Sequence, residues 1–144
     1  MDKLTIDGVK RIAINDDSDR VIEFNPSDIL FAERFYHIYQ EFEQKQDEYL
    51  KRSEELDAQG NDLDEHGMPA NTGERLEFMK EVCGFVRGKI DHLFGEGASQ
   101  KAFGDALSMD MIAQFFEGIT PYVEKARTNK ITKYTSSQDR KVMK

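Results

Sequence analysis

The stretch of sequence that decides the fold spans residues 76–119 and reads LEFMKEVCGFVRGKIDHLFGEGASQKAFGDALSMDMIAQFFEGI. Its first half carries apolar residues three or four positions apart, which is the spacing of one face of an α-helix. These residues are Leu76, Met79, Val82, Cys83, Val86, Ile90 and Leu93. Gly95 and Gly97 follow, and glycine readily takes the left-handed conformation that ends a helix. The pattern predicts a helix that ends near Phe94.

Two more helical pieces are expected after these glycines. The first is short and runs from Ser99 to Leu107. The second begins at Ser108, a good N-terminal cap, and its apolar face comprises Met111, Ile112, Phe115, Phe116 and Ile119. We expect Pro121 to end or bend this helix, because proline lacks an N–H group and crowds the preceding turn.

Before this stretch, residues 3–24 alternate between apolar and polar residues, as β-strands do. Asp7-Gly8 and the polar run at 15–19 are turn signals. We expect two or three short antiparallel strands here. A sheet this small is marginal alone, so it must pack on a helix or on the sheet edge of another subunit.

A long acidic helix and a loop connect the strands to the central stretch. Residues 25–28, Asn-Pro-Ser-Asp, predict a helix start, and the helix runs to about Ala58. Residues 41–65 hold ten acidic residues against three basic ones. This helix is either a solvated projection or an arm that contacts a neighbouring subunit or a basic partner. The loop covers residues 59–73, and we expect Thr72 to cap the next helix.

The predicted fold class is therefore mainly α (α+β), with a small N-terminal antiparallel β-hairpin or meander followed by about four helices. We expect a single domain over residues 1–131. It comprises the β segment 3–24, the acidic helix 27–58, the loop 59–73 and a helical core 74–127. A basic flexible tail follows at 132–144.

Charge and composition exclude several classes of function. The net charge of −8 argues against nucleic acid as the main ligand, because phosphate binding needs clustered Lys and Arg. No apolar run approaches the about 18 residues that a membrane span needs, and the N-terminus lacks the apolar core of a signal peptide. The single cysteine, Cys83, fits a reducing cytoplasm. A low apolar content of 38% favours burial against copies of the chain or a partner.

No catalytic, cofactor or metal site can be assembled from the sequence. Residues 62–67 open like a calcium-binding loop, but Pro69 and Gly73 occupy places that need an apolar residue and a bidentate glutamate. The three histidines lie far apart in sequence, and Cys83 lies on an apolar helix face, which favours a buried structural thiol. We expect a protein that is not an enzyme.

Four aromatic residues are the candidates for partner binding: Phe94, Phe103, Phe115 and Phe116. As core residues they would close the helices on one another. Because Phe115 and Phe116 are adjacent, they cannot both point the same way on a helix. One of them is therefore a candidate for an interface.

Three short motifs carry a resemblance to a known family. They are Phe94-Gly95-Glu96-Gly97, Phe103-Gly104 and Ile119-Thr120-Pro121-Tyr122-Val123. Together with the "TIDG" turn and the acidic helix, they make the chain resemble tail assembly chaperones of tailed phages and prophages of Gram-positive bacteria. The long loop at 59–73 departs from that pattern.

The resemblance implies a non-catalytic protein of the host cytoplasm that is absent from the mature virion. Such proteins bind the tape measure protein, help recruit tail tube subunits and often have a longer frameshifted form. A homo-oligomer without nucleic-acid or membrane partners is expected. Two alternatives stay open: a virion structural or connector protein of the phage tail, and a small acidic regulatory protein that binds a basic host partner through residues 41–65.

Overall fold

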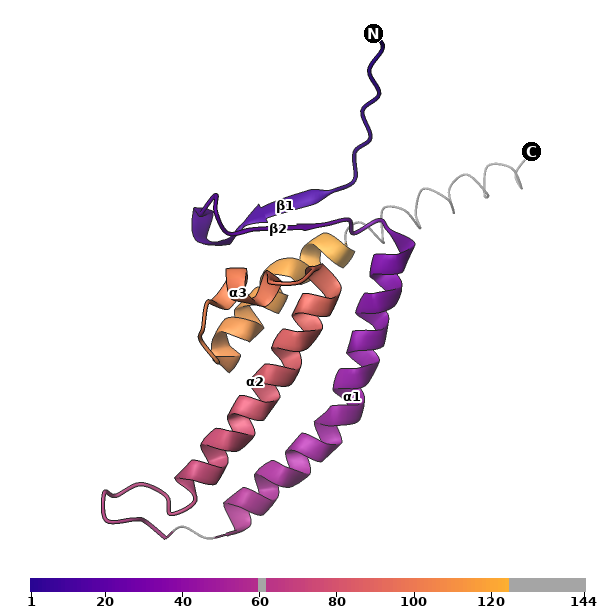
Figure 1. The fold of residues 1–144 in the computed structure, drawn as a ribbon. Coiled ribbons are helices and arrows are strands. Elements are labelled where there is room, and N and C mark those ends of the chain that lie inside the picture. Colours follow the sequence, from indigo (N-terminus) through magenta and orange to yellow (C-terminus); the bar gives the residue numbers. More distant parts are fainter. Residues whose placement is uncertain (60–61, 125–144) are drawn as a thin grey trace, which may run out of the picture.

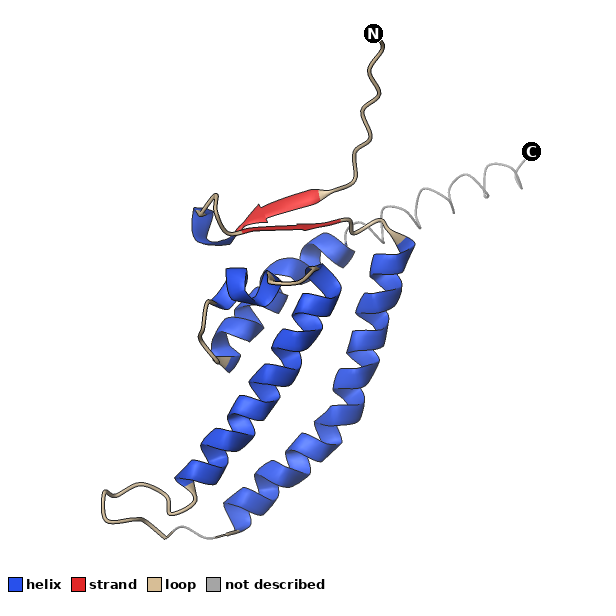
Figure 2. Cartoon of the chain, viewed as in Figure 1, coloured by secondary structure: helices blue, strands red, loops and turns tan. Residues whose placement is uncertain are grey.

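The computed structural model describes residues 1–59 and 62–124, in which a small sheet precedes a long helical hairpin and two shorter helices (Figures 1 and 2). The elements are β1 (Lys10–Ala13), the 3-10 turn η1 (Ile14–Asp16), β2 (Val21–Phe24), α1 (Ile29–Ala58), α2 (Thr72–Phe94), α3 (Ala98–Phe103) and a helix over 109–124. The predicted fold class, mainly α with an N-terminal antiparallel β-hairpin, is confirmed. The predicted basic tail lies outside the described residues.

The sheet has two antiparallel strands, in which Ile12 lies opposite Ile22. Ile22 is buried and Ile12 is half-buried, so this pair marks the face that packs on the helices. Arg11 and Glu23 form an ion pair on the solvent face, with 3.0 Å between Nε and Oε1. The polar run predicted as a turn does connect the two strands, and Asn15 takes a left-handed φ of 54° there.

Of the two or three strands expected over residues 3–24, the structure forms two, and the residues around Leu4 and Ile6 form no third strand. Residues 1–9 pair with no strand among the described residues, and the segment leaves the body of the protein at its N-terminal end (Figure 1). Gly8, two residues before the start of β1, has a φ of 144°. Asp7-Gly8 therefore forms no hairpin turn here.

The helical hairpin is made of α1 and α2, and local capping explains where each begins. The Asp28 carboxylate accepts the N–H of Leu30 at 3.0 Å, so α1 begins at Ile29, two residues after the predicted start at residue 27, and Asp28 is its cap rather than an acid of its first turn. Asn71 is the N-terminal cap of α2, and the prediction that Thr72 caps it is wrong. The Thr72 hydroxyl donates to the Pro69 carbonyl instead. At the other end, α2 stops at Gly95, whose φ is 106°.

The two shorter helices match the predictions in part. The α3 helix ends at Phe103, before the expected Leu107, and Gly104 is its C-terminal cap. Ser108 caps the next helix as predicted, because its Oγ accepts the N–H of Met111 at 3.3 Å. This helix passes through Pro121 to residue 124, so the prediction that Pro121 ends it is wrong. Burial of Ile119 and Val123 on either side of Pro121 compensates for the lost backbone hydrogen bond.

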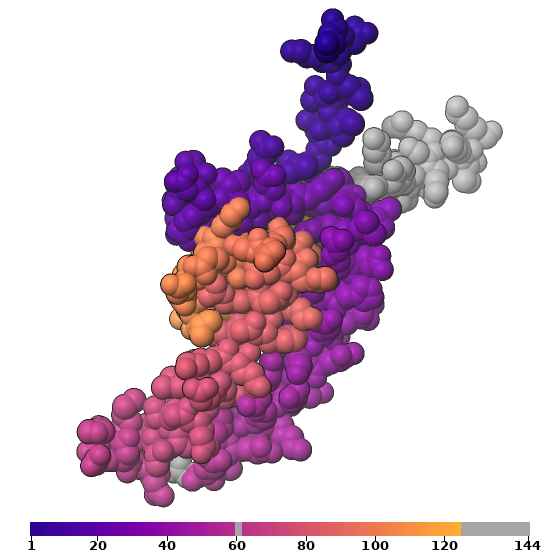
Figure 3. Space-filling model, viewed as in Figure 1, coloured from indigo at the N-terminus to yellow at the C-terminus, as the bar shows by residue number. Residues whose placement is uncertain are grey.

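The buried core lies at one end of the helical hairpin. There α1 contributes Phe31 and Ile38, and α2 contributes four buried residues from Cys83 onward. The rest of the hairpin, residues 39–59 and 62–82, holds no buried residue among those described, and we call it the distal arm. In Figure 3 it extends, in magenta, beyond the broad part of the molecule. Leu76 and Met79, predicted on the apolar stripe, are exposed there.

Candidate functional site

The four predicted partner-binding residues form one packing cluster. Phe103 and Phe115 are buried, while Phe94 and Phe116 are half-buried. The Phe115 ring is the centre, because its centroid lies 5.5 to 5.7 Å from those of the other three rings. Edge-to-face packing of this kind stabilises a core. A role of these rings in partner binding stays a prediction, since the contacts that the structure shows for them are with rings of their own chain.

The aromatic packing continues from this cluster into the distal arm. Phe42 of α1 contacts Phe116 and also Phe85 of α2, in both cases with centroids 6.0 Å apart. Tyr49 then contacts Phe85 at 6.2 Å and Phe78 at 5.9 Å. These rings therefore join the core to the surface between α1 and α2.

The surface where this row of rings ends is an open apolar groove between α1 and α2, with a volume of about 570 Å³. It is lined by Tyr39, Phe42, Glu43, Lys45, Gln46, Tyr49, Leu50, Ser53, Phe78, Val82, Phe85 and Val86. Tyr39 is 60% exposed and Leu50 is 57% exposed, so the groove presents large apolar groups to solvent. Contiguous apolar surface of this kind is typical of interaction sites.

Two basic side chains at the border of the groove, Lys45 and Arg52, form ion pairs. Lys45 donates to the Glu48 carboxylate at 3.2 Å, and this hydrogen bond raises the pKa of Lys45. Arg52 pairs with Glu81 and lies 4.8 Å from the centroid of the Phe78 ring. The distal arm is strongly negative, because residues 41–65 hold ten acidic residues against three basic ones.

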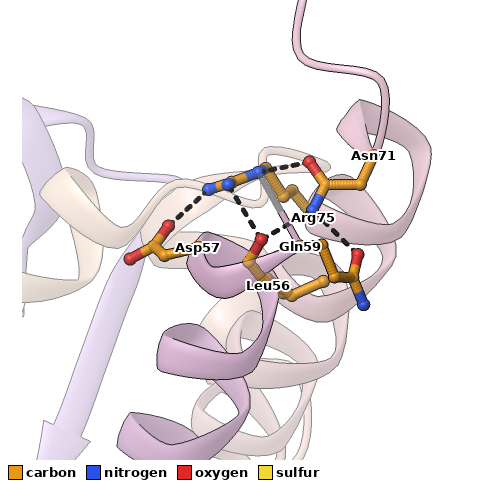
Figure 4. Close-up of polar contacts among 5 residues, drawn as sticks. All are labelled: Leu56, Asp57, Gln59, Asn71 and Arg75. Atoms are coloured by element: carbon orange, nitrogen blue, oxygen red, sulfur yellow. Dashed lines mark hydrogen bonds and ion pairs between the residues drawn. The ribbon is translucent and has the colours of Figure 1, made fainter. Parts of the chain in front are cut away.

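A polar cluster holds the two helices together at the tip of the distal arm (Figure 4). The Arg75 guanidinium donates to Asn71 Oδ1 at 2.7 Å, to Asp57 Oδ1 at 2.8 Å and to the Leu56 carbonyl at 3.1 Å. The Asn71 amide also donates to the Leu56 carbonyl at 2.8 Å and to Gln59 at 3.0 Å. The cap residue of α2 thus links it to the end of α1, which fixes the spacing of the groove walls.

Comparison with known protein families identifies the group to which the chain belongs. A family model described as "Family of unknown function (DUF6673)" matches residues 18–144. The chain belongs to this DUF6673 family. Comparisons with curated proteins and with solved structures gave no match. The match begins before β2 and so covers the helical hairpin and the groove.

In this DUF6673 protein the candidate nucleophile is buried, and two of the three histidines lie in one depression. Cys83 is buried, and burial raises the pKa of its thiol. His37 and His92 line the same shallow depression between α1 and α2. Within residues 1–59 and 62–124, no group of three His, Cys, Asp or Glu side chains is placed to hold a metal ion. In the same residues, no helix is long and apolar enough to cross a membrane.

The candidate calcium loop of the DUF6673 protein folds on itself. Leu63 and Pro69 form an isolated antiparallel bridge, and Asp64 lies inside the turn between them. The Asp64 carboxylate oxygen Oδ1 accepts the N–H groups of His66 at 2.8 Å and of Met68 at 3.0 Å. One of the oxygens that a metal ion would need is therefore used by the loop's own backbone.

Sequence reasoning missed the groove of the DUF6673 protein. The signal was present, because Tyr39, Phe42, Tyr49 and Ser53 repeat at three- to seven-residue intervals along one side of α1. What the sequence lacked was the pairing of that side with Phe78 and its neighbours on α2. Only the hairpin brings the two sets together.

Proposed function

We propose that this protein is a non-catalytic phage tail assembly chaperone, which holds an apolar helical segment of the tape measure protein in the groove between α1 and α2. The observation that carries the proposal is the open groove. Its residues Tyr39 and Leu50 are exposed, because no part of the described chain covers them. The resemblance of the sequence to tail assembly chaperones supplies the identity of the client. The same role includes help in recruiting tail tube subunits in the host cytoplasm.

The shape of the groove suits a helical client. Its α1 wall runs from Tyr39 to Ser53, which corresponds to about 21 Å of helix or four turns. Its α2 wall carries Phe78, Val82 and Phe85 at helical spacing. A third helix that presents apolar residues three or four positions apart would lay them between these walls, as amphipathic helices do in other grooves.

The charge around the groove selects among such clients. An apolar helix with basic flanking residues gains from the acidic distal arm, whereas an acidic helix is repelled. The same charge keeps copies of the distal arm apart, which leaves the groove free for a client rather than for another arm. A chaperone that shields an aggregation-prone helix needs this combination of an apolar groove and charged residues around it.

The test is co-expression with the tape measure protein of the same gene cluster, followed by pull-down and light scattering. Tyr39→Ser with Leu50→Ser should weaken client binding about tenfold or more, because both side chains lie in the groove. The matched control, Ile29→Ser with Leu63→Ser, removes two equally exposed apolar groups outside the groove and should leave binding unchanged. A client that stays insoluble, or equal losses in both double variants, would overturn the proposal.

The acidic excess of residues 41–65 favours a second candidate function, a small acidic regulatory protein that binds a basic host partner. Binding would then fall steeply with salt and with Glu54→Lys and Glu55→Lys, while the groove variants would bind normally. A virion structural or connector protein would instead be found in purified particles, from which a chaperone is absent.

A further inference from the structure

The N-terminal segment of the chain exposes its apolar side chains almost fully to solvent. Leu4 is 86% exposed and Ile6 is 84% exposed. They alternate with polar residues at the two-residue period of a strand. Figures 1 and 3 show the segment, in indigo, standing away from the rest of the molecule. An extended apolar segment of this kind is suited to pairing with another strand.

A matching strand edge lies next to this segment. Within the described residues, β1 pairs only with β2, so its other edge is open. A cavity of about 350 Å³ lies beneath that edge and is lined by Ile12, Ile14, Phe103, Met111 and Phe115 among others, but by no residue of β2. The cavity is therefore on the open side of β1, where a third strand would place its apolar side chains.

We propose that two copies of this chain form a dimer in which residues 4–14 of each pair antiparallel with each other about a two-fold axis at Val9. In this register, Ile6 lies opposite Ile12 of the second copy and Leu4 lies opposite Ile14. Residues directly opposite in an antiparallel pair share one face of the sheet. Leu4 and Ile6 consequently lie on the face of Ile12 and Ile22, which is the buried face, and cover the cavity.

Charge and backbone freedom agree with this register. Asp7 lies opposite Arg11 of the second copy, on the solvent face where Arg11 already pairs with Glu23. Gly8 is the only residue of the segment at a positive φ, and glycine passes to the extended conformation without a side-chain penalty. In this register the Ile12 residues of the two copies lie six residues apart along the strands, so the two copies are offset by about 20 Å.

Pairing of the segment with β1 of its own chain conflicts with turn geometry. A two-residue turn at Asp7-Gly8 would place Leu4 opposite Arg11, on the solvent face. A three-residue turn at 7–9 restores the correct face but places Val9 in the left-handed position that ends such a loop, and β-branched residues avoid that conformation. A second copy is free of both constraints. The dimer also turns two marginal two-stranded sheets into one of four strands.

Disulfide trapping tests the register directly. Val9→Cys alone should form a disulfide-linked dimer, because the axis places the two copies of this position opposite each other. Ile6→Cys alone should not, because the two copies of residue 6 lie about 20 Å apart along the strands. A mixture of Ile6→Cys and Ile12→Cys chains should again cross-link. The buried native Cys83 serves as the background control in the unmodified protein.

Light scattering gives the second readout. The unmodified chain should be a dimer at about 100 µM, a concentration well above a micromolar dissociation constant. The double variant Leu4→Ser with Ile6→Ser should be a monomer by light scattering. It should stay folded by circular dichroism, since both side chains are exposed in the single chain. Leu63→Ser is the matched control and should stay dimeric. A monomeric unmodified chain, or an internal disulfide in the Ile6→Cys with Ile12→Cys double variant, would overturn the proposal. The proposal does not depend on client binding in the groove.

Discussion

Ile90 and Leu76 belong to the same apolar stripe of α2, yet their surroundings differ. Ile90 is 1% exposed and Leu76 is 54% exposed. Ile90→Ala should lower the free energy of unfolding by about 2–5 kcal/mol, because it removes buried methyl groups and leaves a cavity. Leu76→Ala should change it by less than about 0.5 kcal/mol. Urea denaturation of the two variants measures both values, and equal losses would contradict a core confined to one end of the hairpin.

Cys83 makes stability depend on pH in the alkaline range. Burial raises the pKa of its thiol in the folded chain above that in the unfolded chain. As pH rises above about 8.5, the unfolded chain loses its proton first, so the free energy of unfolding falls. Below that pH the contribution is fully present. Cys83→Ala should show a shallower decline between pH 8 and about 10, measured by denaturation at several pH values. An unchanged slope would mean that the thiol does not contribute.

Residues of the core were the easiest to predict from the sequence. Periodicity alone identified Cys83, Ile90 and Phe115, because burial on a helix follows the apolar face. The exposure of Leu76 was not predictable in the same way. It depends on how far the sheet and the two shorter helices reach along the hairpin, and that distance is set by tertiary packing.

At the scale of elements, the tip of the distal arm is held by Arg75. Arg75→Ala removes hydrogen bonds to Asn71, Asp57 and the Leu56 carbonyl. Because the cluster is partly solvated, the free energy of unfolding should fall by only about 1 kcal/mol. Hydrogen exchange should accelerate at the adjoining ends of α1 and α2. The control, Lys80→Ala, removes an exposed contact with Glu77 within one helix and should leave exchange at the tip unchanged.

Helix starts show which elements a sequence can predict. Asp28 and Ser108 cap their helices through contacts within three residues, so a local pattern was sufficient. The same rule predicted Thr72 as the cap of α2, whereas the cap is Asn71. The Asn71 side chain forms hydrogen bonds across the hairpin, and the local sequence pattern does not indicate such contacts. The residues around Leu4 form no third strand for a related reason, since an extended segment needs a partner edge.

At the scale of the whole molecule, the core and the groove occupy different parts of the hairpin. At the core end, the sheet, α3 and the helix over 109–124 pack on the hairpin. In the distal arm, α1 and α2 pack only on each other among the described residues. The groove could not be predicted because it is a product of two helices whose relative rotation the sequence does not state. The row of rings from Phe115 through Phe42 to Tyr49 is the physical link between the two parts.

Two hydrogen bonds join the turn before β2 to α3, which lies far along the chain. Arg20 donates to the carbonyls of Lys101 at 2.7 Å and of Ala102 at 3.0 Å, although more than eighty positions separate them. A ribosome makes the β-hairpin and the first turns of α1 long before these carbonyls exist. Ile22, Phe24 and Phe31 are buried only after residues beyond 100 have been made, so a nascent chain exposes apolar surface, which favours aggregation, for most of its synthesis.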